Sequence, residues 1–337
     1  MKSKIEALAS HPLHSIKPRP TNYRQTNKMT KHIRTMALTF CTTVMLCGSG
    51  IAQESTPAPA AEDIEKPAQM GAPRWEGSLN SGFVAGSTAK FQGARLANSD
   101  AFNLRLEAGT RIDLNDRWLL RLGLASENFW LEQASGAPIP GQIHTLRFNT
   151  ALSYRWDEKW TFTGLIGPSL YRFQNVGSGD FGFSGGVMAS YQANPSLRWS
   201  FGIMATPDGD IPVLPIAGVR WLINDRYTLE LGVPKTRLSY RLDSKWSVYG
   251  GADFHGTTFR TSDDLGTRTG LTQYNHALAT YRDIRLGVGT SYEIIQGLRA
   301  ELEAGYSIYR RIDYTRIDEQ VEFNPAPYVR LGLSVRF

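Results

Sequence analysis

The residues best suited to chemistry are Asp253 and His255, which are separated by a single residue in the run Asp253-Phe254-His255. Side chains alternate between two faces along a β-strand, so both would point the same way. An Asp–His pair next to a serine could activate that serine as a nucleophile. The sequence places no serine beside the pair, and such i, i+2 pairs are common on strands. We therefore predict a hydrogen-bonded structural histidine and no enzyme activity.

Other signatures of chemistry are lacking in the sequence. There is no P-loop, dinucleotide fingerprint or His-Glu-x-x-His motif. Asp263 and Asp264 could bind Ca²⁺ from a loop, but two adjacent acids are weak evidence for such a site. We predict no catalytic residue, no cofactor and no metal site.

The elements that carry these residues are best seen at the C-terminus, where 325–337 reads PAPYVRLGLSVRF. Val329, Leu331, Leu333, Val335 and Phe337 would share one face, and polar residues would share the other. This period of two indicates a β-strand that is apolar on one side and ends on an aromatic residue.

The same alternation repeats from Arg74 to the end, and the strands are connected alternately by short turns and longer loops. The short turns combine Asn, Asp, Pro or Ser with a following aromatic residue, at 115–118, 157–160, 194–199, 224–227 and 243–246. Such residues favour tight turns, and the aromatics would form one belt at a membrane surface. We expect loops near 87–100, 127–143, 172–180, 206–211, 256–275 and 311–324.

The pattern predicts about 14 strands, an even number as expected for bacterial barrels. The weakest stretch is 226–242, where a turn at Val233-Pro234-Lys235 leaves two strands of about seven residues. If that stretch were one bent segment, or if the first strand failed, the count would fall to about 12. The predicted fold is all-β, a transmembrane antiparallel barrel spanning 74–337.

The polar face carries charges of both signs, which fits a wet lumen better than lipid. Charged rings in a pore can favour anionic solutes, whereas cross-strand ion pairs would brace the wall and narrow the lumen. Both signs alternate on the same strands, which favours bracing. The lumen-lining candidates are Arg105, Arg111, Arg121, Arg147, Arg155, Arg198, Arg220, Arg237, Arg241, Arg285, Arg299 and Arg330.

The N-terminal part reads as a targeting segment. Residues 29–52 combine a basic start, an apolar run and small residues, which predicts a signal peptide cleaved after Ala52, and Met29 is an alternative start to Met1. Residues 53–73 are rich in Pro, Ala and Glu and predict a flexible periplasmic leader. Residues 1–52 hold eight basic residues and one acid, so the rest of the chain has 29 basic and 30 acidic residues. The formal charge of +6 is therefore no argument for nucleic-acid binding.

The signal segment, the leader, the aromatic-flanked turns and the end PYVRLGLSVRF together resemble bacterial outer-membrane β-barrels. The resemblance implies location in the outer membrane of a Gram-negative cell. It also implies contact with membrane lipid, with periplasmic chaperones and with the barrel-insertion machinery. That machinery would read a C-terminal signal of Tyr328, Leu333, Val335 and Phe337. The segments 214–216, 232–234 and 238–241 are similar to an uncharacterised family of such barrels, known only as a domain of unknown function.

The leading functional hypothesis is a passive or weakly selective pore for small polar or anionic solutes. The alternative is a structural or surface-interaction barrel, with its lumen closed by ion pairs and its function in the external loops. An outer-membrane enzyme is a third possibility.

Overall fold

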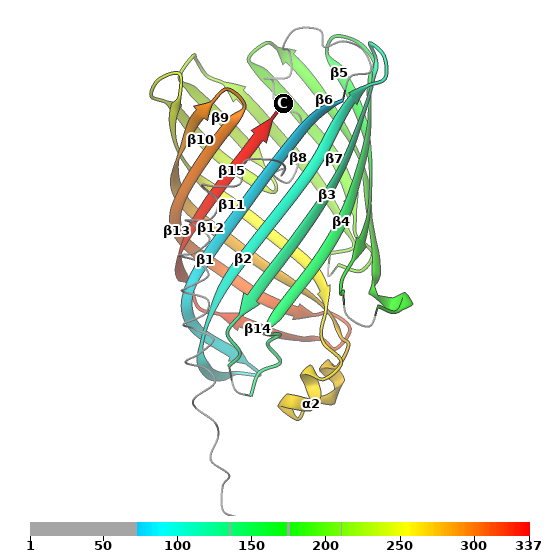
Figure 1. Cartoon of the computed structure of the whole chain (residues 1–337), viewed down its shortest axis with the longest axis vertical. Helices are drawn as coiled ribbons and strands as arrows, with labels where there is room; N and C mark the ends of the chain where they lie inside the picture. Colours follow the sequence, from blue (N-terminus) through cyan, green and yellow to red (C-terminus); the bar gives the residue numbers. More distant parts are fainter. Residues whose placement is uncertain (1–72, 135, 174–175, 210) are drawn as a thin grey trace, which may run out of the picture. The chain divides into compact units, whose positions relative to one another are not determined.

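The computed structural model describes residues 73–134, 136–173, 176–209 and 211–337. The predicted signal segment 1–52, with Cys41 and Cys47, and the leader up to residue 72 lie outside the described residues. The described chain folds into one antiparallel sheet (Figure 1), whose strands in order are β1 Arg74–Phe91, β2 Ala94–Asp113, β3 Trp118–Leu131, β4 Gln142–Arg155, β5 Trp160–Leu170, β6 Phe181–Asn194, β7 Leu197–Ala205, β8 Val213–Leu222, β9 Tyr227–Gly232, β10 Lys235–Arg241, β11 Trp246–Arg260, β12 Leu278–Ile295, β13 Leu298–Tyr314, β14 Glu319–Phe323 and β15 Ala326–Arg336.

The sheet closes on itself because the last strand pairs with the first. β15 runs antiparallel to β1, from the pair Glu76–Arg336 to the pair Val84–Tyr328. β14 continues the same line, since it also lies between β13 and β1. β14 and β15 are thus two parts of one barrel strand, interrupted at Asn324-Pro325. The predicted 14-stranded barrel is confirmed, and the 12-stranded alternative is wrong because β9 and β10 both form.

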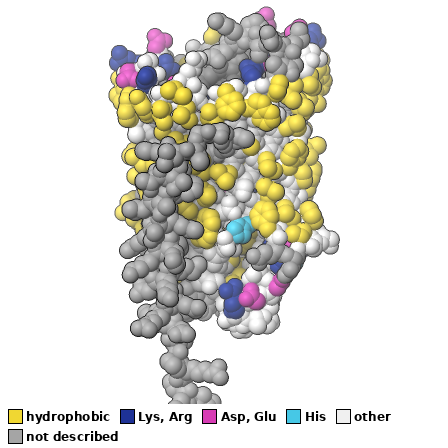
Figure 2. Space-filling model, viewed as in Figure 1, with side chains coloured by type: hydrophobic (Ala, Val, Ile, Leu, Met, Phe, Trp, Pro, Cys, Tyr) yellow, Lys and Arg dark blue, Asp and Glu magenta, His cyan; other side chains and the backbone are white. Residues whose placement is uncertain are grey.

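The predicted parity of the strands is also confirmed. The outward-pointing Val187 and Val288 are 64% and 68% exposed, whereas the inward-pointing Ser153 and Ser291 are 5% and 6% exposed. Figure 2 shows hydrophobic side chains spread over the side of the barrel. A one-residue slip of any strand would turn its charged side chains towards lipid. No helix among the described residues is long and apolar enough to cross a membrane.

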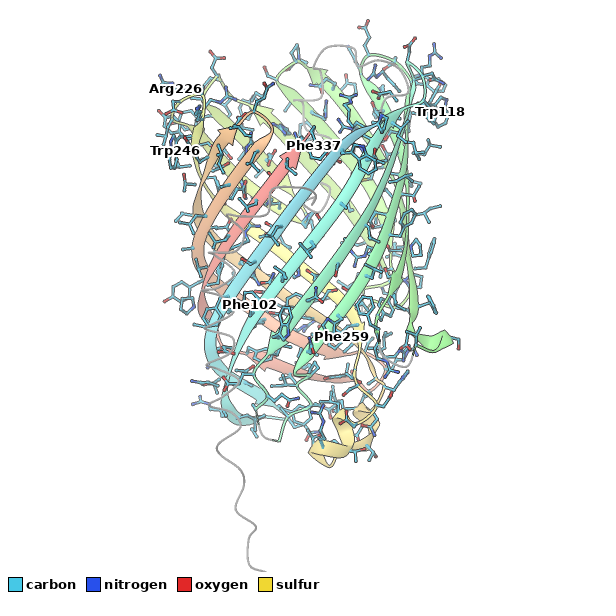
Figure 3. The ribbon with its side chains drawn as sticks, viewed as in Figure 1. Phe102, Trp118, Arg226, Trp246, Phe259 and Phe337 are labelled. Carbon is cyan, nitrogen blue, oxygen red and sulfur yellow. The ribbon has the colours of Figure 1, made fainter. Side chains whose placement is uncertain are left out.

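The tight turns gather at one end of the barrel, together with the C-terminus, and we call this the short-turn end. In the turn before β11, the backbone N–H groups of Lys245 and Trp246 donate to Asp243 Oδ1 at 2.7 and 2.8 Å. Asn115, Asp157 and Asn224 accept the same pair of bonds in their turns. The aromatic residue after each turn lies at this end, as Trp118 and Trp246 do in Figure 3. The predicted turn chemistry therefore holds in these four turns, and in the fifth Asn194 Oδ1 accepts from the Ser196 N–H alone.

The opposite end, which we call the loop end, differs from the prediction. Most of the predicted loops 87–100 and 311–324 is strand: β1 and β2 meet at a tight turn at Gln92-Gly93, and β13 continues to Tyr314. The predicted 256–275 loop starts later, at 261, and contains α2 Leu265–Thr269 and the short helix η3 Thr272–Tyr274. A second short helix, η2 Ser178–Asp180, precedes β6. The polar sequence of these segments suggested loops, but strand pairs such as Ala89–Phe323 extend the sheet into them.

Candidate functional site

The lumen is closed at the loop end by an apolar cluster, which we call the cap. Phe129, Phe259, Tyr274, Tyr281 and Tyr314 are all 0% exposed within it. The O–H of Tyr314 donates to the carbonyl of Pro138, so the loop before β4 is tied to β13. Figure 3 places Phe259 at this end of the barrel. A cluster packed in this way narrows the lumen at the loop end.

Beyond the cap, the half of the lumen lined by β10–β13, β15 and β1 is filled with ion pairs. Arg330 Nη2 lies 2.6 Å from Glu303 Oε2 and 3.7 Å from Glu301 Oε2, and its Nη1 lies 3.6 Å from Asp253. Arg237 lies 3.5 Å from Glu301 and stacks on the ring of Tyr249. These contacts link strands that are not all neighbours. The bracing role favoured for the arginines therefore describes this half of the barrel.

A second buried group continues the network along β12 and β13. Arg285 Nε donates to Asp283 Oδ2 at 2.7 Å, and Ser307 donates to the other oxygen of the same carboxylate at 2.6 Å. Asp283 is fully buried, and these donors satisfy both of its carboxylate oxygens.

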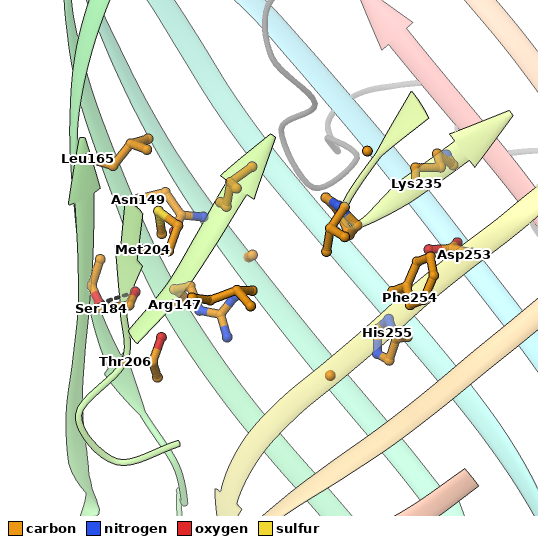
Figure 4. Close-up of a pocket in the computed structure, with 18 of the residues that line it drawn as sticks. Arg147, Asn149, Leu165, Ser184, Met204, Thr206, Lys235, Asp253, Phe254 and His255 are labelled. Carbon is orange, nitrogen blue, oxygen red and sulfur yellow. Dashed lines mark hydrogen bonds between the residues drawn. The ribbon is translucent and has the colours of Figure 1, made fainter. Parts of the chain in front are cut away.

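Next to this network lies a cavity of about 830 Å³, and Asp253, Asp283, Arg285 and Arg330 of the network are part of its lining. Figure 4 shows Arg147, Asn149, Leu165 and Met204 around it on one side, with His255 on the other. Nine of its lining side chains are Lys or Arg and four are Asp or Glu. The lining thus holds more basic than acidic side chains.

Arg147 is the lining residue best placed to meet a solute. No ion pair joins it to another described residue, and its buried Nε has no hydrogen-bond partner there. The neighbouring acids are already engaged, since Glu107 binds Arg105 and Glu127 Oε1 lies 2.9 Å from His255 Nε2. Arg147 therefore keeps donors that an anion could use.

The His255–Glu127 contact shows where the histidine lies. The pair joins β11 to β3 across the lumen, and the ring of His255 lies against that of Phe129. Thr145 and Thr257 meet at 3.5 Å near the same level. Asp253, the partner expected from the sequence, instead pairs with Arg330. His255 thus lies between the polar lumen and the cap.

The twelve arginines singled out from the sequence fall into different places. Arg155, Arg241 and Arg299 are exposed near the short-turn end. Arg111 is half-buried on β2, and Arg237 belongs to the ion-pair network. The cavity lining includes Arg105, Arg121, Arg147, Arg198, Arg220, Arg285 and Arg330.

The four residues of the predicted C-terminal signal do not share one face. Leu333, Val335 and Phe337 point outwards, and Phe337 is 66% exposed. Tyr328 is buried on the lumen side, where its O–H donates to Glu303 Oε1 at 2.6 Å. Tyr328 is thus part of the lumen network, while the outward residues face lipid.

Sequence reasoning missed the apolar part of the lumen. Leu165, Met188, Met204, Leu214 and Ile216 all line the cavity, on β5–β8. Each of them has the parity of its strand's polar face. Leu214 and Ile216, for example, share the parity of Arg220 on β8, which also lines the cavity. A strand-by-strand parity count could have found them, because they break the expected polar pattern.

Comparison with solved structures finds barrels at low similarity. The COG4313 outer membrane channel from Pseudomonas putida F1 has 12% identity and a TM-score of 0.44, over 84% of this chain and 100% of that one. The TodX monoaromatic hydrocarbon channel deltaS2 mutant, from the same species, has 12% identity and a TM-score of 0.44, over 80% and 91%. A Pseudomonas aeruginosa FadL homologue has 11% identity and a TM-score of 0.38, over 79% and 90%.

No curated protein sequence matches the chain. The family model that does match is that of the domain of unknown function DUF6268, over residues 83–337. This range covers nearly the whole barrel, from within β1 to the C-terminal Phe337, so the chain belongs to the DUF6268 family.

Proposed function

We propose that this protein is an outer-membrane channel for small anionic solutes that pass through a basic cavity rather than along a straight open pore. The observation that carries the proposal is the cavity lining, with nine basic and four acidic side chains and with Arg147 outside every ion pair among the described residues. The apolar outer face and the predicted signal peptide support the location.

The electrostatics favour anions over cations in this cavity. Basic groups lining a narrow wet space raise the local concentration of anions, and the low-dielectric wall strengthens the effect. Arg105, Arg220, Arg285 and Arg330 are each paired with an acid, which offsets their charges in part. Arg147 adds a positive charge near the middle of the cavity (Figure 4).

The alternative function is a structural barrel whose external loops bind a partner. The cap and the ion-pair network favour it, because together they fill the loop end and half of the lumen. The two functions differ in one measurable property: a channel conducts ions and a filled barrel does not.

The test is the current through refolded protein in a planar bilayer, with a salt gradient to read selectivity. We expect small steps, because the cap narrows the path, and a zero-current potential of the sign that indicates anion preference. Heat-dependent gel mobility shows that the barrel is folded. Silence from folded protein, or a preference for cations, would refute the channel and leave the structural barrel.

A further inference from the structure

The wall of the barrel is shortest at the β9–β10 hairpin. β9 has 6 residues and β10 has 7. At about 3.4 Å per residue and a tilt of about 40°, seven residues rise roughly 18 Å, less than the roughly 25 Å apolar band of a membrane barrel. The neighbouring β11 has 15 residues and continues well beyond the hairpin. The hairpin therefore ends inside the membrane.

Between the tip of this hairpin and the loop end, two strand edges lack a sheet partner. The β8–β9 ladder begins at Gly218–Gly232, so 213–217 pairs only with β7. The β10–β11 ladder ends at Lys235–Asp253, beyond which a single bond runs from Phe254 N–H to the Pro234 carbonyl at 2.7 Å. Residues 255–260 of β11 pair only with β12 among the described strands. Pro215, which has no N–H, lies on the open β8 edge, as proline does in edge strands.

On its loop-end side, this gap is bounded by the end of β11, which contacts another part of the wall. The backbone N–H of Arg260 donates to the carbonyl of Tyr171, just after β5, at 3.5 Å. Its Nη2 donates to the carbonyl of Gly179 at 2.5 Å, and its Nε lies 3.3 Å from Asp180. At the loop end, β11 thus contacts the end of β5 directly, although β6–β10 separate the two strands in the sheet. The unpaired edges of β8 and β11 and the β9–β10 turn bound a gap in the hydrogen-bonded wall, which we call the aperture.

The side chains around the aperture change from apolar to basic on the way in. Phe254 lies on its outer rim, and Leu214 and Ile216 line its inner side on β8. Leu165 and Met204 also line the cavity, and Arg147 lies between them and His255 in the view of Figure 4.

Backbone edges without a partner are costly in lipid and are tolerated where they line a wet cavity. We propose that this aperture is a side entrance through which small amphiphiles with one anionic group pass between the lipid phase and the cavity. The apolar part would contact the β5–β8 side chains, and the anionic group would reach Arg147. The proposal rests on the proposed channel function and adds the route and the class of its solute.

The test uses one introduced thiol in the full chain. Cys41 and Cys47 are the only cysteines and lie outside the barrel, so both can be changed to serine. Ile216→Cys is labelled with a fluorophore, and Asn80→Cys, which lines the cavity from β1, is the matched control. The probe is a spin-labelled fatty acid in liposomes, because a nitroxide quenches fluorescence only at contact range.

We expect quenching at position 216 and little at position 80. We also expect unlabelled decanoate to reverse the quenching, and decanol not to reverse it. Arg147→Gln should raise the decanoate concentration that reverses half of the quenching about tenfold, because the substitution removes a charge-assisted hydrogen bond. Equal quenching at the two positions overturns the proposal.

A second variant closes the aperture. A Cβ at Gly256, on the free edge of β11, would contact only the carbonyl oxygen of Tyr281, at 3.8 Å, so Gly256→Trp adds bulk at the rim without a backbone clash. Loss of quenching in this variant supports the route, and unchanged quenching overturns it. If its gel mobility shows misfolding, Ala217→Trp on the β8 edge serves instead.

The failure of this proposal is distinct from failure of the channel. Anion-selective current without quenching at position 216 refutes the aperture alone, and quenching without anion-selective current refutes the channel alone.

Discussion

Replacing Arg147 by glutamine should reduce anion selectivity more than any other single arginine change in the lumen. Its guanidinium lines the cavity and makes no ion pair with a described residue, so its charge acts on the solute rather than on the wall. A unit charge about 4 Å from an anion contributes about 1 kcal/mol in bulk water and about 4 kcal/mol at an effective dielectric constant of 20. A wet cavity lies towards the lower figure. We therefore expect a loss of about 1–2 kcal/mol, or roughly five- to thirtyfold in anion affinity.

The control is Arg220→Gln, because Arg220 lines the same cavity but is paired with Glu230 at 3.2 Å. The assay is the zero-current potential of each variant in a salt gradient, with the stability of each followed by its gel-shift temperature. Arg147→Gln should move the potential towards zero with little loss of stability. Arg220→Gln should lower stability by exposing an unpaired acid, and should also move the potential. A larger shift of the potential for Arg220→Gln, or none for Arg147→Gln, would refute the reasoning.

Further variants test the cap, the register and the turns. Phe259→Ala should open part of the cap, raise the conductance and cost about 3–5 kcal/mol of unfolding free energy, measured by urea titration. Val288→Arg should destabilise the barrel by about 2–4 kcal/mol through its lipid-facing position, whereas Thr163→Arg, on the cavity side, should cost much less in the same titration. The two N–H donors in its turn hold the pKa of Asp243 below its usual value, so the stability it contributes is present above the unfolded pKa and is lost as the pH falls through the folded pKa. Asp243→Asn should keep the turn and remove this acid dependence, whereas Asp243→Ala should weaken the turn at every pH of an acid titration followed by circular dichroism.

Much of the fold was predictable because the strands and turns of a membrane barrel produce short-range patterns in the sequence. The alternation of side chains assigned the faces of β4 and β13, and the Asn or Asp before each aromatic located the tight turns. Even the two short strands around Val233-Pro234 were found. These features depend on neighbours in the sequence, so one sequence is enough to recognise them.

The features missed from the sequence depend on residues far apart in the chain. The cap joins Phe129, Phe259 and Tyr314, which come from three separate hairpins. No periodicity tells that the loop ends of these hairpins bend inwards and pack together. The same holds for the partner of His255. The sequence pointed to Asp253, two residues away, but in the structure the ring contacts Glu127.

The identity of the arginine left outside the ion pairs was equally hidden. Arg105 and Arg147 both lie on polar faces of neighbouring strand pairs, and the sequence treats them alike. Glu107 stands two residues from Arg105 on the same strand and binds it, whereas the polar neighbour of Arg147 on its own strand is Asn149. Only the pairing in space shows which charge remains for a solute.

The ion-pair network and the cavity next to it explain how one barrel can be both braced and open. A barrel with a hairpin as short as β9–β10 loses wall hydrogen bonds on one side, so its curvature must be held by other contacts. The network around Arg330 and Asp283 lies next to this hairpin, where it ties β11, β12, β13 and β15 together and where Arg237 joins β10 to it. The docking of Arg260 on Tyr171 and Asp180 supplies the remaining link over the gap. The ion pairs therefore do not exclude a channel: they stabilise the wall that the cavity and its side opening weaken.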